Sequence, residues 1–137
     1  EPYRRQRQMC IRDRVGIIMD KIEFLRSMNV DVDQGIQNMM DVQTYDEMLG
    51  DFYDSIPEEL SKIDNFKNAG DMPNYAILVH AMKSNARSFG FMKLGDICYA
   101  HELAGKAGDV NYVNLHYNEL LQAAKETISI IEKYKTM

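Results

Sequence analysis

The sequence contains no tryptophan, only three prolines and only two cysteines. The cysteines, Cys10 and Cys98, are too few for a disulfide framework and lack the spacing of a metal site, which favours a reducing, cytoplasmic setting. No apolar run approaches the roughly 18 residues that a membrane-spanning helix requires, and the basic start of the chain is not followed by the apolar stretch of a signal peptide. We therefore expect a cytoplasmic protein without membrane insertion.

Positive charge is scarce beyond the first 14 residues. Those residues hold five of the 16 basic and two of the 21 acidic side chains, which leaves 11 basic against 19 acidic and a net charge of −8 over residues 15–137. A body of this charge repels phosphate backbones, so we expect no nucleic-acid partner. Segment 4–14 also resembles translated sequencing-adapter sequence. We interpret residues 1–14 as a disordered or artefactual basic tail and exclude them from functional reasoning.

Apolar residues recur every three or four positions along most of the chain, whereas the period-two pattern of a strand does not occur. The stripes predict helices from Thr44 to Gly70, from Asp71 to Gly90, over about 92–107, and from Asn111 onwards. Four amphipathic helices joined by short loops predict an all-α protein, an antiparallel four-helix bundle over residues 31–137. Within it, 31–41 is a connecting segment of one or two helical turns. Residues 15–30 are an additional N-terminal helical segment or a linker.

Capping and breaking residues set the expected helix ends. Thr44 and Glu47 have the form of a capping box, and Asn111 is expected to cap the last helix. Pro57 lies inside the first stripe and is expected to kink or split that helix. Gly90 is expected to end the second helix in a left-handed conformation.

The most informative segment is residues 75–90. On a helical wheel of about 100° per residue, the residues opposite His80 are apolar and predict the core face: Tyr75, Leu78, Met82 and Phe89. The residues within about 60° of His80 are small, polar or cationic: Ala76, Lys83, Ser84 and Arg87. His80 is therefore expected to point towards solvent or a partner.

This arrangement suits a phosphoryl carrier. A neutral imidazole is a good nucleophile, and Lys83, one turn further on, is placed to hold the oxygens of a phosphoryl group. Ala76 and Ser84 leave room for a second protein, and Arg87 is expected to dock against its acidic pocket. The sequence has no glycine-rich nucleotide loop and no cluster of metal-binding carboxylates. We therefore expect a non-enzymatic carrier with no ATP site or cofactor of its own, and Mg²⁺ supplied by the partner.

The run His80-x-x-Lys83-Ser84-x-Ala86-x-x-x-Gly90, inside a four-helix pattern, resembles the signature of histidine-containing phosphotransfer (HPt) domains over roughly residues 30–134. Segments 74–80 and 105–109 are similar to the terminal HPt domains of bacterial hybrid sensor histidine kinases. The resemblance implies a phosphorelay intermediate of two-component signal transduction. His80 would accept a phosphoryl group from the aspartate of a response-regulator receiver domain and pass it to another receiver.

The resemblance also implies roles for further residues and partners. Lys83 would support the phosphoryl group, and Gly90 would let one helix end and the next begin. A hybrid histidine kinase in cis would be a further partner and would tether the domain to a membrane sensor.

Two positions depart from the family pattern. Asn85 is bulkier than the usual residue, and the wheel turns it towards the bundle, where it would need an internal hydrogen bond. A polar residue that approaches the histidine from the following helix in this family falls near Glu102. A carboxylate there would repel phosphate, so we leave Glu102 out of the predicted site.

Other interpretations of the same residues stay open. His101 lies on an apolar stripe and is expected to be packed, whereas His116 is expected to face solvent. Cys98 and His101 have the spacing of a metal-binding pair but no evident third ligand. The chain could also be a receiver-docking module that no longer carries phosphate, which receiver binding without transfer would favour. A small helical enzyme or metal protein is the third class, and metal analysis tests it.

Overall fold

The computed structural model describes residues 2–137, and it describes side chains from Asp13 onwards with the exception of Val15. These residues form six helices and no strand: α1 (Pro2–Ser27), α2 (Val32–Met39), α3 (Val42–Asn68), α4 (Met72–Ser88), α5 (Met92–Lys106) and α6 (Val110–Thr136). The all-α prediction is confirmed. The side chains of residues 1–12 lie outside the described ones, so the interpretation of residues 1–14 as a tail stays a prediction.

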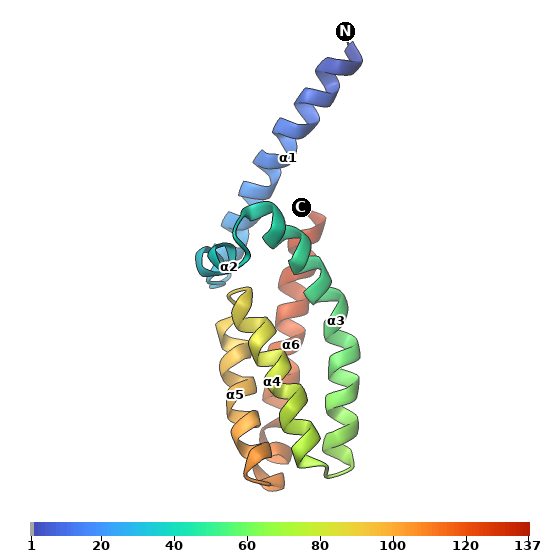
Figure 1. Cartoon of the computed structure of the whole chain (residues 1–137), viewed down its shortest axis with the longest axis vertical. Coiled ribbons are helices and arrows are strands. Elements are labelled where there is room, and N and C mark those ends of the chain that lie inside the picture. The colour runs from blue at the N-terminus through green and yellow to red at the C-terminus, as the bar shows by residue number, and fades with distance from the viewer. Residues whose placement is uncertain (1) are drawn as a thin grey trace.

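The predicted four-helix bundle consists of α3 to α6, which lie alongside one another in Figure 1. Helices α4 and α5 form the most extensive contact, and α6 packs against both α5 and α3. Helix α1 extends away from one end of the bundle, and α2 lies at that same end (Figure 1). The last turns of α1 join the core, where Ile22 and Leu25 are buried.

Aspartates cap four of the six helices. Each accepts a hydrogen bond from the backbone N–H three residues further on: Asp31, Asp41, Asp71 and Asp109. The predictions that Thr44 and Asn111 are the caps are therefore wrong. Both residues lie within the first turn of their helices, because a carboxylate upstream already satisfies the free N–H groups there.

Pro57 does not split α3, which runs as one helix from Val42 to Asn68. The proline removes one helical hydrogen bond, at a cost of about 3 kcal/mol in an isolated helix. Apolar burial on both sides of it offsets that cost, because Ile56 and Ile63 are fully enclosed and Phe52 is nearly so. Tertiary packing thus overrides the local preference.

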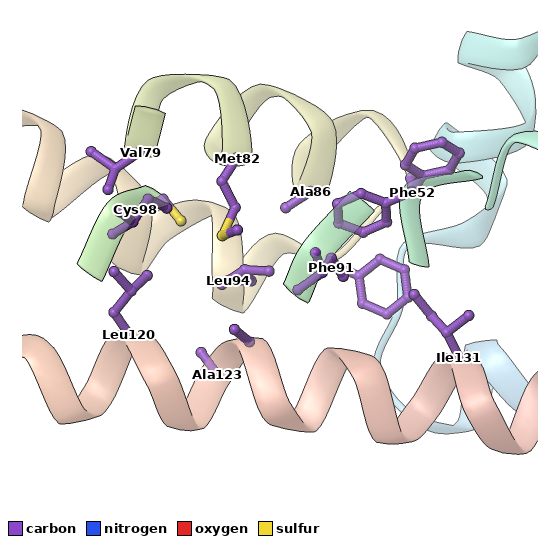
Figure 2. Close-up of a cluster of buried hydrophobic side chains, with 14 of the residues drawn as sticks. Phe52, Val79, Met82, Ala86, Phe91, Leu94, Cys98, Leu120, Ala123 and Ile131 are labelled. Atoms are coloured by element: carbon purple, nitrogen blue, oxygen red, sulfur yellow. The ribbon is translucent and has the colours of Figure 1, made fainter. Parts of the chain in front are cut away.

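The core of the bundle is drawn in Figure 2. Val79, Met82 and Ala86 project from α4 towards Leu94 and Cys98 of α5, and side chains of α6 close the layer from the other side. At the end next to α2, Phe52 stacks on Phe89 with ring centroids 5.1 Å apart. The core is continuous along the bundle.

The buried face of α4 is rotated by about 60° from the one that the wheel predicts. Val79 and Ala86 are fully buried and mark the centre of this face. The core face predicted from the helical wheel did not include them. Two predictions are wrong for this reason. Asn85 is exposed instead of turned into the bundle, and Ala76 is buried, with 5% of its surface exposed.

The turn between α4 and α5 is held by hydrogen bonds from residues 31–45, the segment that contains α2. Gly90 has a φ of +91°, which confirms its predicted left-handed conformation. Its carbonyl oxygen accepts a hydrogen bond of 2.9 Å from the N–H of Asp31. The carbonyls of Phe89 and Ser88 accept from the hydroxyl of Tyr45 and the amide of Asn38. Residues 31–45, which include α2 and the start of α3, therefore supply donors to three successive carbonyls at the end of α4.

Candidate functional site

His80 lies on the solvent side of α4, and 55% of its side chain is exposed. Its Nδ1 is 3.0 Å from Oε2 of Glu102, which reaches across from α5. Its Nε2 has no hydrogen-bond partner among residues 13–137 whose side chains are described. The prediction that this ring stands clear of the core is confirmed.

Glu102 is the centre of the site although it is only 2% exposed. Lys83 donates to its Oε1 at 2.6 Å, and Lys106 donates to its Oε2 at 2.9 Å. Burial alone would raise the pKa of this carboxyl, but the hydrogen bonds from Lys83, Lys106 and His80 outweigh burial and hold the pKa at about 2. Glu102 is therefore a buried anion that accepts hydrogen bonds from three side chains.

The charge of Glu102 decides which nitrogen of His80 carries the proton. An ionised carboxylate can only accept hydrogen bonds, so a neutral His80 donates from Nδ1–H. The lone pair of the ring then lies on Nε2, the nitrogen that faces away from Glu102. In its neutral form, the imidazole therefore directs its nucleophilic atom away from Glu102.

Lys83 and Lys106 flank the histidine from α4 and α5. Lys83 is largely covered, with 12% of its side chain exposed, and it lies over the ring of Tyr99 at 5.2 Å. Lys106 is 63% exposed. Each ammonium has three N–H donors and uses one of them in its hydrogen bond to Glu102. Both therefore have N–H groups left for a further anion. With Glu102 they leave one net positive charge beside the imidazole.

The other predicted docking residues are placed unevenly. Ser84 is exposed as expected. Arg87 is 37% exposed and is engaged within the chain, since it forms an ion pair of 3.1 Å with Asp96 and lies over Tyr99 at 5.4 Å. Ala76 is buried, yet it forms part of the floor of a groove beside His80.

That groove has a volume of about 530 Å³ and opens next to the imidazole. Its lining comes from α4 and α5: Pro73, Ala76, Ile77, His80, Gly105 and Lys106. Gly105 brings the two helices close together, because a Cβ added there would lie 3.0 Å from the Cβ of Ala76. Ile77 stands at the groove with 63% of its surface exposed. The result is an apolar surface beside the nucleophile.

The other histidines have structural surroundings. His101 is buried as predicted, its Nδ1 accepting from the hydroxyl of Tyr75 and its Nε2–H donating to the carbonyl of His116. His116 is 31% exposed, so it is more covered than expected. Burial raises the pKa of the Cys98 thiol to about 12. Among residues with described side chains, no three metal-binding groups come together, which leaves the Cys98–His101 pair without a third ligand.

Sequence reasoning missed Glu102, Lys106 and Ile77. Glu102 was set aside because a free carboxylate repels phosphate, an argument that fails once two ammonium groups neutralise it. The signal was present in the sequence, since Glu102 and Lys106 are four residues apart on one helix and form an ion pair there. Only the crossing of α4 and α5 brings that pair to His80.

An all-helical bundle that presents one outward imidazole, backed by a buried carboxylate and two lysines, defines a class of small histidine-bearing carrier modules. A family model, the Hpt domain, matches residues 47–127, more than half of the chain. The chain therefore belongs to the Hpt domain family, whose members are phosphocarrier modules that serve as phosphotransfer intermediates in phosphorelays and interact with receiver domains. Comparisons with curated proteins and with solved structures gave no significant match.

No helix in the described part of the chain is long and apolar enough to cross a membrane.

Proposed function

We propose that the protein is a phosphorelay intermediate that accepts a phosphoryl group on Nε2 of His80 from a receiver aspartate and passes it to the aspartate of another receiver. The observation that carries this proposal is the hydrogen bond between Nδ1 of His80 and Glu102, in a side chain that is 55% exposed. A neutral His80 that donates from Nδ1 has its lone pair on Nε2.

The proposed step balances without a cofactor on this chain. The lone pair of His80 Nε2 attacks the phosphorus of the aspartyl phosphate, and an N–P bond forms as the P–O bond to the aspartate breaks. The electron pair of the broken bond returns to the aspartate carboxylate. The proton on Nδ1 stays in its hydrogen bond to Glu102, and onward transfer reverses these changes. The partner's acidic pocket supplies the Mg²⁺ that stabilises the phosphoryl group.

The groove beside His80 is the proposed docking surface for the receiver. It lies against the nucleophile, it exposes Ile77, and Lys106 adds positive charge at its edge. An apolar patch with a cationic border suits a partner whose acidic pocket carries the phosphoryl group. Ser84 and Arg87, on the other side of His80, extend this surface. A hybrid kinase in cis is the proposed source of one receiver, with the protein tethered in the cytoplasm at a membrane sensor.

The experiment is transfer from a purified receiver domain charged with labelled acetyl phosphate in the presence of Mg²⁺. The unmodified protein is expected to gain acid-labile label, and His80→Gln is expected to gain none. The matched control is His116→Gln, which removes the other partly exposed histidine and should transfer normally. Label that persists in His80→Gln would refute the proposal. Receiver binding with no label on the unmodified protein would favour a docking module that no longer carries phosphate.

A further inference from the structure

Lys83 and Lys106 make the same contact but differ in exposure. Each donates a hydrogen bond to a carboxylate oxygen of Glu102, at 2.6 and 2.9 Å. The side chain of Lys106 is 63% exposed, as is usual for a lysine at a surface, whereas that of Lys83 is only 12% exposed. The contact with Glu102 therefore does not account for the burial of Lys83, and another neighbour covers it.

That neighbour is the ring of Tyr99 on α5. The ammonium of Lys83 lies 5.2 Å from the centroid of this ring, a distance at which the π face of an aromatic ring attracts a cation. Within the part of the chain whose side chains are described, no such ring lies beneath Lys106. Glu102 thus holds both lysines, and Tyr99 distinguishes one from the other.

Tyr99 lies at the surface and carries a second cation. The tyrosine is 44% exposed, and the guanidinium of Arg87 lies 5.4 Å from the centroid of its ring. Two cations beside one ring repel each other, but each is paired with a carboxylate of its own. Glu102 pairs with the lysine, and Asp96 pairs with the arginine at 3.1 Å. The charges around the ring therefore balance, and the ammonium of Lys83 stays where the ring and Glu102 hold it.

A lysine held in this way is ready for an incoming anion. A free lysine side chain samples many rotamers, and it loses this freedom when its ammonium binds a phosphoryl oxygen. Lys83 has already lost that freedom between Glu102 and Tyr99. A charge that is fixed beforehand needs no rearrangement at the moment of reaction. The ring therefore lowers the entropic cost of the support that Lys83 gives to a phosphoryl group.

We infer that Tyr99 is a positioning residue that holds the ammonium of Lys83 beside His80 through its ring face, and that this preorganisation speeds phosphoryl transfer to the histidine. The inference rests on the proposed function, because it needs His80 as the acceptor and Lys83 as the support of the phosphoryl group. It adds a residue that acts on the reaction only through a lysine.

The test measures the rate of transfer from a receiver domain charged with labelled acetyl phosphate. Tyr99→Leu keeps an apolar side chain but removes the ring, and the rate is expected to fall about two- to fivefold, as the loss of an exposed cation–π contact implies. Tyr99→Phe keeps the ring face and should restore the rate of the unmodified protein. Tyr53→Leu is the matched control, because Lys135 lies 4.3 Å from the centroid of the Tyr53 ring, between α3 and α6. It should leave the rate unchanged.

A double-mutant comparison separates action through Lys83 from direct contact with the receiver. Lys83→Gln can still donate a hydrogen bond to Glu102 but carries no charge, and Lys106 keeps a cation at the site, so a measurable rate remains. In this background Tyr99→Leu should slow transfer no further. An equal slowing in both backgrounds would show that Tyr99 acts on the receiver or on the fold, and would overturn the inference. An unchanged rate in Tyr99→Leu itself would overturn it as well.

A second readout needs no receiver. The Hε protons of Lys83 lie over a ring face, so they should resonate upfield of those of Lys106 in ¹H–¹³C NMR spectra. The upfield shift should persist in Tyr99→Phe and disappear in Tyr99→Leu. Its absence from the unmodified protein would overturn the role of Tyr99 and leave His80 as the carrier. An unmodified protein that shows the shift but gains no label would instead contradict the proposed function.

Discussion

Replacing Gly90 with alanine tests how far the segment before the bundle is part of the folded domain. Gly90 has a φ of +91°, and a non-glycine residue in this region costs about 1–2 kcal/mol. An added Cβ would also lie 2.2 Å from the carbonyl oxygen of Asp31 and 2.5 Å from its carbonyl carbon. Backbone atoms cannot rotate away, so the contact between Asp31 and Gly90 has to open.

The hydrogen bond from Asp31 N–H to the Gly90 carbonyl is then lost, which costs a further 1–3 kcal/mol or so when the groups stay unsatisfied. We expect Gly90→Ala to lower the free energy of unfolding by about 2–5 kcal/mol in urea denaturation. The matched control is Gly108→Ala, where φ is +68° but nothing lies within 4 Å of the added Cβ. It should lose only about 1–2 kcal/mol. Equal losses in the two variants would refute the proposed close contact.

Three further predictions concern docking and stability. Ile77→Asp should slow phosphoryl transfer from a charged receiver at least fivefold or so by placing a charge on the docking groove, whereas Leu115→Asp, on α6 outside the groove, should not; equal rates would contradict the docking surface. Tyr75→Phe leaves the buried Nδ1 of His101 without its donor and should cost about 1–3 kcal/mol in thermal or urea unfolding, with no change in the protein's transfer activity. Burial lowers the pKa of His101 below 6.5, and hydrogen bonds lower that of Glu102 from 4.5 to about 2, so the unfolded chain binds protons more readily than the folded one. Urea denaturation should therefore show stability that is full above about pH 6.5 and falls as the pH drops, first through His101 and below about pH 4.5 through Glu102; a flat profile between pH 7.5 and 3.5 would contradict this.

The fold was predictable because its signals are local. Apolar spacing and the turn glycines placed the four bundle helices, and Gly90 took the conformation expected of it. The errors at Thr44 and Asn111 came from competition between adjacent capping residues, which spacing alone does not rank. Pro57 does not split its helix because of packing on both sides of the residue, which no local rule includes.

The site was only half predictable. The exposure of His80 follows from the periodicity of one helix, but its hydrogen bond to Glu102 depends on how two helices cross. The helical wheel also took its core direction from a set of residues that omitted Val79 and Ala86. The predicted core face of α4 was therefore rotated, and the burial of Ala76 and Asn85 was predicted wrongly. Long-range contacts of this kind leave no trace in the spacing of either helix by itself.

The three carbonyls at the end of α4 have a consequence for where this domain ends. Their donors come from Asp31, Asn38 and Tyr45, all of which precede the segment 47–127 that defines family membership. A protein trimmed to that segment would lose all three donors at the turn that follows the helix of His80. We therefore expect a piece that begins at Asp31 to be more stable than one cut to the matched segment.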